Sequence, residues 1–277
     1  MKKILDEVRG TKSVAISGHI RPDGDCVGSC MGLYLYLTKE LPETTVDVFL
    51  EKPSDVFKCI QNVDAIKDAA QYRDAEYDVF IALDCRKDRL GDAEIIFDHA
   101  KKTINIDHHI RNSGCGDVNY LRADASSASE LVYELLDAEK LDEEIAKALY
   151  IGIIHDTGVF QYSNTAPATL VTASELVKYG FNFPEIIEET FYEKTYVQNQ
   201  IMGRALLESI LFMDGRCIVA VISKEMMNFY GVTGKDLDGI INQLRIIKGV
   251  ECAIFMYQTG NMEYKVSMRS NSYVDVS

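Results

Sequence analysis

The first two-thirds of the chain alternates short apolar runs with amphipathic stretches. The apolar runs are rich in β-branched residues, as expected for strands buried in a parallel sheet, and they are SVAISG (13–18), TTVDVFL (44–50), YDVFIALD (77–84) and KTINID (102–107). Helical patterns such as CVGSCMGLYLYLTKE (26–40) and DAEIIFDHAK (92–101) separate them. This alternation predicts an α/β fold with a parallel sheet.

The pattern changes further along the chain. Three helical stretches cover 126–140, 142–158 and 168–180. Residues 184–211 carry no strand signal, and this predicts one long connecting helix that begins near Pro184. Strand-like runs then alternate with helical ones at RCIVAVIS (216–223), KEMMNFYG (224–231), DLDGIINQLRIIKG (236–249), ECAIFMYQ (251–258) and MEYKVSMRS (262–270). We therefore expect a first domain at 1–183, a helical connector at 184–211 and a smaller α/β domain at 212–277.

Composition is that of a globular protein, with 47% hydrophobic and 26% charged residues in 277. No apolar run approaches the roughly 20 residues that span a bilayer, and the N-terminus lacks the apolar core of a signal peptide. Seven scattered cysteines without a Cys-x-x-Cys pair indicate free thiols in a reducing compartment. We expect a cytoplasmic protein that does not bind membranes.

The formal net charge is −14. Proteins hold long nucleic acids by replacing phosphate counterions with Lys and Arg, so this charge argues against a long nucleic acid as partner. Short oligonucleotides and mononucleotides remain candidates, and bound divalent cations would reverse the local sign of an acidic site.

Polar groups gather where the predicted strands end. In an open α/β sheet, ligands bind outside the carboxyl ends of the strands. Seven acidic or histidine side chains fall there, and an eighth lies near the end of the apolar helix of 142–158. In chain order they are His19, Asp23, Asp25, Asp84, Asp107, His108, His109 and Asp156. A turn at Pro22–Asp25, with Asp25 capping the next helix, would explain the aspartates there but not His19. Convergence of three strand ends favours a functional site.

Five carboxylates and several imidazoles at one edge cannot keep their charge near neutral pH without cations. Oxygen and imidazole ligands without thiolate suit Mn²⁺, with Co²⁺, Zn²⁺ or Fe²⁺ as other occupants. The groups are too many for one tetrahedral zinc, which takes about four ligands. Two divalent cations therefore fit better than one.

The motifs GHIRPDGDCVGS, ALD, DHH and HDTG resemble, in order and spacing, those of the DHH phosphoesterases, and the later DLDGIINQLRIIKGVECAIFMYQ and VSMRS resemble the companion DHHA1 domain. The resemblance covers almost the whole chain. In size and layout the chain is similar to the stand-alone oligoribonucleases of the family, which degrade nanoRNA and dephosphorylate 3′-phosphoadenosine 5′-phosphate (pAp).

The resemblance also implies a role for each group. One metal would be held by His19, Asp23 and Asp84, and the second by Asp25, Asp84, His108 and Asp156, so that Asp84 bridges the pair. His109 would face the scissile phosphate, and Asp107 would orient its neighbours. Arg269 and Ser270 match the substrate-binding positions of the second domain. The family's glycine-rich GGGH segment would follow YVDVS: either residues beyond Ser277 supply it, which we expect, or the protein lacks it.

Other residues have simpler explanations. His99 is predicted to be a surface histidine near a helix C-terminus, and His155 need not reach the metals because adjacent helical side chains point about 100° apart. Serines 126, 127 and 129 are expected to cap the following helix. Tyr34 and Tyr36 are assigned to the core because they recur at helical spacing.

These observations predict a dimetal phosphoesterase that hydrolyses short oligonucleotides to 5′-mononucleotides, removes the 3′-phosphate of pAp, or does both. Two alternatives stay open: a phosphodiesterase that hydrolyses the linear dinucleotide pApA in cyclic dinucleotide turnover, and a nucleotide-binding regulator without catalysis. The sequence leaves open whether the protein forms a homodimer.

Overall fold

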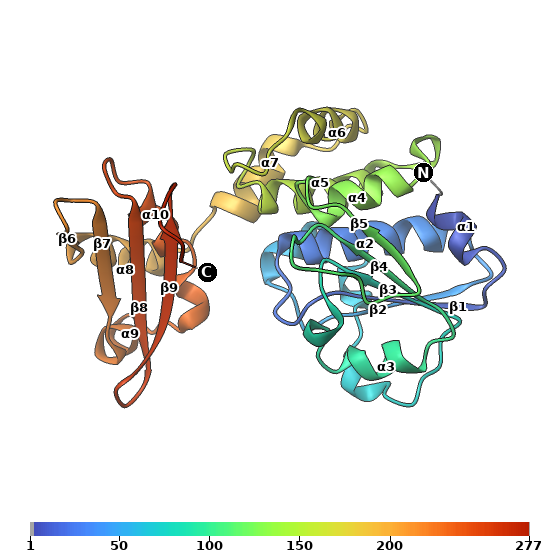
Figure 1. The fold of residues 1–277 in the computed structure, drawn as a ribbon, viewed down its shortest axis with the longest axis horizontal. Coiled ribbons are helices and arrows are strands. Elements are labelled where there is room, and N and C mark those ends of the chain that lie inside the picture. The colour runs from blue at the N-terminus through green and yellow to red at the C-terminus, as the bar shows by residue number, and fades with distance from the viewer. Residues whose placement is uncertain (1–2, 277) are drawn as a thin grey trace. The chain divides into compact units, whose positions relative to one another are not determined.

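Residues 3–276 are described by a computed structural model, in which the chain divides into two units between Tyr192 and Glu193. Each unit has its own sheet (Figure 1), and each has its own buried core. The predicted α/β fold with a second, smaller sheet domain is confirmed. None of the helices in residues 3–276 is long and apolar enough to span a bilayer.

The sheet of the first unit is entirely parallel. Its strand order is β2-β1-β3-β4-β5, and the strands are β1 Ser13–Ser17, β2 Thr45–Phe49, β3 Val79–Leu83, β4 Thr103–Asp107 and β5 Val118–Leu121. The first four lie within two residues of their predicted limits. Strand β5 was not predicted, because it is a four-residue edge strand with no fully buried side chain.

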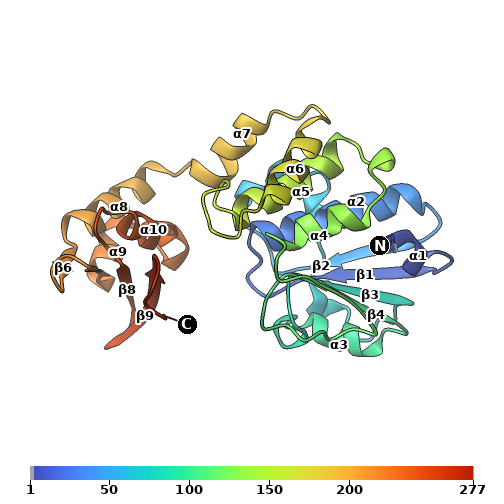
Figure 2. The same ribbon diagram turned by 45° about the horizontal axis from the view of Figure 1, so that its top comes forward.

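Helices cover both faces of this sheet. One face carries α2 and α4 with α5 packed against both, and the opposite face carries α3 (Figures 1 and 2). The helices of the first unit are α1 Ile4–Val8, α2 Gly24–Glu40, α3 Ala93–His99, α4 Ala128–Leu135, α5 Glu143–Asp156, α6 Pro167–Val177 and α7 Phe183–Ile187. Side chains on β3 alternate accordingly: Ile81 joins the core under α2, and Phe80 joins the core under α3.

Helices α2 and α5 approach each other through main-chain atoms. A Cβ added at Gly28 would lie 2.5 Å from the carbonyl oxygen of Ala148 and 2.7 Å from the amide nitrogen of Gly152. Only glycine permits this approach. Because Asp25 lies in the first turn of α2 and Asp156 is the last residue of α5, the glycine contact fixes the spacing between the helices that carry these two carboxylates.

The prediction of a single helix over 184–211 is wrong. The range contains the end of α7, a π-helical turn at Glu188–Tyr192, helix α8 at Tyr196–Leu207 and the start of strand β6 (Ile210–Phe212). A capping box explains the new start: Thr195 Oγ1 accepts the Gln198 N–H (3.2 Å), and Gln198 Oε1 accepts the Thr195 N–H (2.9 Å). The boundary between the units lies beside this interruption.

The second unit has a four-stranded mixed sheet of order β6-β7-β8-β9, in which β7 and β8 are parallel and the outer pairs are antiparallel. Its other elements are β7 Cys217–Ile222, α9 Lys224–Tyr230, α10 Ile240–Arg245, β8 Cys252–Gly260 and β9 Glu263–Ser270. The core packs Ile218, Ala220 and Phe255 of the sheet against α8, α9 and α10. Within residues 193–276, side chains of the opposite sheet face such as Val221 and Val266 remain exposed.

We predict that Gly28→Ala lowers the free energy of unfolding by about 1–3 kcal/mol, because the added methyl meets main-chain atoms that no rotamer change can move. Gly203→Ala in α8 is the control. No atom lies within 4 Å of a Cβ at Gly203, so alanine there should raise stability by about 0.5–1 kcal/mol through helix propensity alone. Urea unfolding followed by circular dichroism measures both. Equal stability of Gly28→Ala and the parent would show that α2 and α5 can separate freely.

Candidate metal centre

The predicted site residues of the first unit meet at one edge of its sheet. His19 follows β1, Asp84 follows β3 directly, and His108 follows β4. These three strands are neighbours in the sheet, so their carboxyl ends bring the side chains together. Asp23 and Asp25 are added by the start of α2 and Asp156 by the end of α5.

Asp84 lies at the centre of the cluster, and its two carboxylate oxygens face different groups. Oδ2 is 3.3 Å from His19 Nε2, whereas Oδ1 is 3.4 Å from His108 Nε2. The residue is 2% exposed, and Oδ1 is buried without a hydrogen-bond donor anywhere in residues 3–276. Its backbone has a left-handed φ of 58°, which is costly for a non-glycine residue and is found where function requires it.

His108 is surrounded by the second set of carboxylates. Its Nε2 lies 3.9 Å from Asp25 Oδ2 and 3.8 Å from Asp156 Oδ2. Asp25 is held by the beginning of α4, whose amides at Ala128 and Ser129 donate to its two oxygens at 2.7 and 2.9 Å. Each Asp25 oxygen keeps a lone pair that can bind a cation.

His19 and Asp23 form the other side of the cluster. His19 Nδ1 lies 2.9 Å from the carbonyl oxygen of Ile20, which can only accept, so Nδ1 carries the proton. Nε2 is then left facing Asp84 and, at 3.6 Å, Asp23 Oδ1. The helix cap expected from Asp25 is supplied by Asp23, whose Oδ1 accepts the amides of Asp25 and Cys26.

His109 is oriented by a hydrogen bond rather than by the cluster. Its Nδ1 lies 2.7 Å from Asp107 Oδ1, and its side chain is 48% exposed. Asp107 is fully buried, and its carboxylate also accepts the amides of His108 and His109 and the side-chain amide of Asn112. This arrangement fixes one ring nitrogen and leaves Nε2 free for a molecule arriving from solvent.

Sequence reasoning missed the asparagines that support the site. Asn164 Nδ2 donates to Asp156 Oδ2 at 3.1 Å. Asn112 Nδ2 donates to Asp107 and to Asn105 Oδ1. Asn105 was detectable in principle, because an amide in the middle of an otherwise apolar strand has to find buried partners.

The electrostatics of the cluster indicate a shortage of positive charge. Burial opposes the charged form of both His19 and His108, yet neighbouring carboxylates raise the pKa of His19 to about 11 and that of His108 to about 10. Burial and the nearby Asp84 carboxylate raise the pKa of Asp25 well above its usual range, and burial is the main cause that raises the pKa of Asp156 to about 6. Divalent cations would supply the missing charge, and the orphaned Asp84 Oδ1 offers them a ligand atom.

The simpler explanations hold for His99, His155 and Tyr36, whereas of the three serines expected to cap a helix only Ser127 does so: Ser126 instead donates to Glu130, and Tyr34 is only partly buried. His99 is exposed at the end of α3, and Tyr36 is buried in the core. The His155 ring packs on Phe57 and Phe191, and Ser127 caps α4. All seven cysteines are free thiols.

Cys26 lies close enough to His19 and Asp84 to be considered as a ligand. Burial raises the pKa of its thiol well above the usual value. A cation at this position would have to displace the thiol proton, whereas the neighbouring carboxylates and imidazoles offer the oxygen and nitrogen ligands that suit Mn²⁺.

Arg269 and Ser270 lie in the second unit, at the end of β9. The Arg269 guanidinium is exposed and donates to the carbonyl of Met268 (3.0 Å), and the Ser270 hydroxyl donates to Glu251 (2.9 Å).

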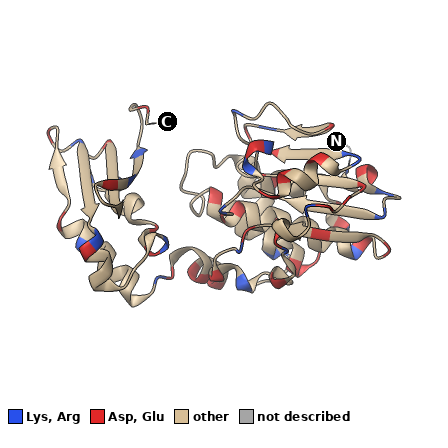
Figure 3. Cartoon of the chain, turned by 90° about the horizontal axis from the view of Figure 1, so that it is seen from below, with Lys and Arg blue, Asp and Glu red and all other residues tan. Residues whose placement is uncertain are grey.

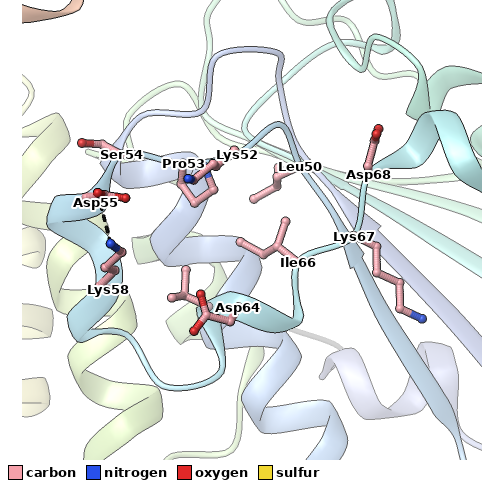
Figure 4. Close-up of a pocket in the computed structure, with 11 residues that line it drawn as sticks. Leu50, Lys52, Pro53, Ser54, Asp55, Lys58, Asp64, Ile66, Lys67 and Asp68 are labelled. Atoms are coloured by element: carbon pink, nitrogen blue, oxygen red, sulfur yellow. Dashed lines mark ion pairs between the residues drawn. The ribbon is translucent and has the colours of Figure 1, made fainter.

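A separate pocket of about 270 Å³ lies beneath the loop that follows β2 (Figure 4). It is lined by Leu50, Ile66 and charged side chains that include Lys58, whose ammonium pairs with Asp55 at 3.1 Å. Its three lysines and three aspartates cancel in formal charge, and none of the predicted site residues lines it. The pocket therefore offers neither the ligands nor the net charge of a phosphate or metal site.

Comparison with known proteins agrees with this geometry. Residues 13–153 match the DHH family, N-terminal domain. The probable bifunctional oligoribonuclease and PAP phosphatase of Streptococcus mutans is 28% identical over 280 residues, which are 99% of this chain and 86% of that protein. The bifunctional oligoribonuclease and PAP phosphatase of Bacillus subtilis is 26% identical over 95% of this chain and 82% of its own length.

A solved structure has the same fold. The exopolyphosphatase-related protein from Bacteroides fragilis matches with a TM-score of 0.89 and 24% identity, over 96% of this chain and 82% of that one.

We predict that Mn²⁺ binding at pH 7 releases protons from the site, with His19 and His108 among their sources, because imidazole binds a metal through a neutral nitrogen. The neighbouring carboxylates raise the pKa of both rings, to about 11 and about 10, which favours protonated rings before the metal binds, and the raised pKa of Asp25 adds to the release. Calorimetry in buffers of different ionisation enthalpy counts the protons. His99→Ala should leave the count unchanged and His19→Ala should reduce it by one, whereas proton-neutral binding would contradict the assignment.

Proposed function

The chain belongs to the DHH family, and on this premise we propose that it is a metal-dependent phosphoesterase that hydrolyses short oligoribonucleotides to 5′-mononucleotides and removes the 3′-phosphate of pAp. The names of the Streptococcus mutans and Bacillus subtilis relatives, which match almost the whole chain, support both activities. The position of the candidate site at the carboxyl ends of β1, β3 and β4 supports a phosphate ligand there.

One observation carries the proposal. The two oxygens of the Asp84 carboxylate face separate imidazoles, His19 on one side and His108 on the other, at 3.3 and 3.4 Å. A carboxylate divided in this way suits a pair of cations better than one. We assign His19, Asp23 and Asp84 to the first cation, and Asp25, Asp84, His108 and Asp156 to the second.

Mn²⁺ is the occupant that we propose, because the ligands are carboxylates and imidazoles without thiolate. When bound, two such cations activate water for attack on phosphorus and stabilise the charge that develops on the phosphoryl oxygens. Asp25 stays in place through its hydrogen bonds to α4, and Asn164 restrains Asp156. Ligands restrained by neighbouring hydrogen bonds hold a metal in a defined geometry.

His109 is the residue that we propose acts on the scissile phosphate. Its hydrogen bond to Asp107 is the main cause that raises its pKa, which favours a ring protonated on both nitrogens. With Nδ1 donating to Asp107, Nε2 can donate a hydrogen bond to a phosphoryl oxygen or a proton to the leaving group.

The second unit has the role of a substrate-binding domain in this proposal, with residues 212–277 as the DHHA1-like part. Arg269 forms no ion pair with any residue in 3–276, so its guanidinium is available for the phosphate of a terminal nucleotide. Ser270 adjoins it at the end of β9.

Replacing Asp84 by alanine removes the carboxylate shared by both cations, so we predict that metal occupancy and activity are lost together. Mutations of residues that only orient metal ligands commonly cost 10–100-fold, so the loss for a shared ligand should exceed about 100-fold. His99→Ala is the control and should retain both properties. Elemental analysis and pAp hydrolysis with Mn²⁺ provide the measurements, and an Asp84→Ala protein that keeps two metals would refute the bridging role.

Short substrates should be preferred over long ones. Acidic side chains outnumber basic ones, 43 to 29, and in the view of Figure 3 the Lys and Arg segments are interspersed with Asp and Glu segments. We expect kcat/KM for RNAs of increasing length to fall, and its logarithm to depend on log salt with a slope no steeper than about −2, since few phosphates are contacted. The series should include pApA. Efficient degradation of long single strands would instead indicate a processive exonuclease.

A further inference from the structure

The carboxylate of Glu251 accepts several hydrogen bonds from the chain segment at the end of β9. Glu251 precedes β8 and is 8% exposed. It accepts hydrogen bonds from three backbone amides, those of Ser272 (2.9 Å), Tyr273 (2.8 Å) and Val274 (3.3 Å). The hydroxyls of Ser270 and Ser272 donate to it at 2.9 and 2.8 Å. Five donors from four residues of the segment 270–274 therefore converge on one side chain.

These donors are all neutral, and Glu251 forms no ion pair with any residue in 3–276. Burial by itself would raise the pKa of Glu251, but the amides and hydroxyls lower it to about 2. The carboxylate is ionised at any pH at which the protein would be studied. Charge-assisted hydrogen bonds of this kind are stronger than neutral ones, so the segment 270–274, here called the β9 arm, is held at a defined position.

Asn271 adds a second set of contacts between the β9 arm and the unit. Its amide donates to the Glu251 carbonyl at 2.9 Å, and its side chain donates to the carbonyls of Val250 (2.7 Å) and Arg245 (3.0 Å). The end of the β8–β9 pairing at which Cys252 lies opposite Ser270 is thereby fixed. Arg269 is the residue immediately before the arm, and its exposed guanidinium projects from this fixed backbone.

We propose that Glu251 is a positioning residue for substrate binding, which fixes the β9 arm and thereby holds Arg269, the residue immediately before the arm, where a substrate phosphate can contact its guanidinium. This inference rests on the proposed function. A side chain that is already ordered loses little entropy when it binds a ligand, so positioning strengthens binding. Because Glu251 does not belong to the metal cluster of the first unit, it should affect substrate affinity and leave the chemical step unchanged.

The test is Glu251→Gln in the whole chain, with Glu263→Gln as the matched control. Glu263 is an exposed acid at the start of β9, so its replacement makes the same change of charge in the same unit. For Glu251→Gln we expect KM for pAp to rise about tenfold while kcat and Mn²⁺ content stay within about twofold, which is the signature of lost binding that does not involve the transition state. Glu263→Gln should match the parent.

Two further measurements separate positioning from general damage. Hydrogen exchange of the Ser272, Tyr273 and Val274 amides should be slow in the parent and fast in Glu251→Gln. In an Arg269→Ala background, Glu251→Gln should add less than twofold to KM, because the group it positions is already gone.

Each outcome has a separate meaning. Fast exchange of the arm with unchanged KM, or fully additive effects of the two mutations, would overturn the role of Glu251 and leave the proposed function standing. Loss of metal or a fall in kcat would also overturn it, because Glu251 would then act on the first unit. A parent chain that neither binds nor hydrolyses pAp or short RNA would overturn the proposed function itself, and the substrate role of Glu251 with it.

Discussion

Repulsion between carboxylates is the constraint on which the first unit depends. Asp25, Asp84 and Asp156 all lie within 3.9 Å of one nitrogen of His108, and so many negative charges cannot stay ionised together without compensation. The fold supplies part of it through the amides at the start of α4, which bind Asp25. Protons or cations have to compensate the rest of the negative charge. The same carboxylates therefore determine both the charge of the site and its affinity for a metal.

The second unit contains a carboxylate in the opposite situation. Glu251 accepts hydrogen bonds at both oxygens and has a pKa of about 2, whereas Asp84 Oδ1 is buried without any donor in the described part of the chain. Both side chains are largely buried acids. The supply of neutral donors distinguishes them: a carboxylate whose lone pairs are used holds the backbone together, and one whose lone pairs are unused is available to a cation.

The sequence predicted most of the first unit because its signals are local. Strand ends, apolar periodicity and the position of Asp84 after β3 follow from patterns of a few residues. The break before α8 was missed, although Thr195 and Gln198 form a recognisable capping pair, because the surrounding helical pattern outweighed it. The contacts of Asn164 and Glu251 could not be predicted, since each joins segments whose proximity only the tertiary fold determines.

The close contact of α2 and α5 at Gly28 bears on which cation the cluster would accept. Where two helices touch through main-chain atoms, no side chain can change rotamer to widen the gap, and Asp25 is further restrained by α4. Adjustment to an ion of different radius therefore falls on Asp23, whose side chain is 62% exposed. The restrained carboxylates would discriminate between ions by size, and Asp23 would allow exchange between ions of similar radius.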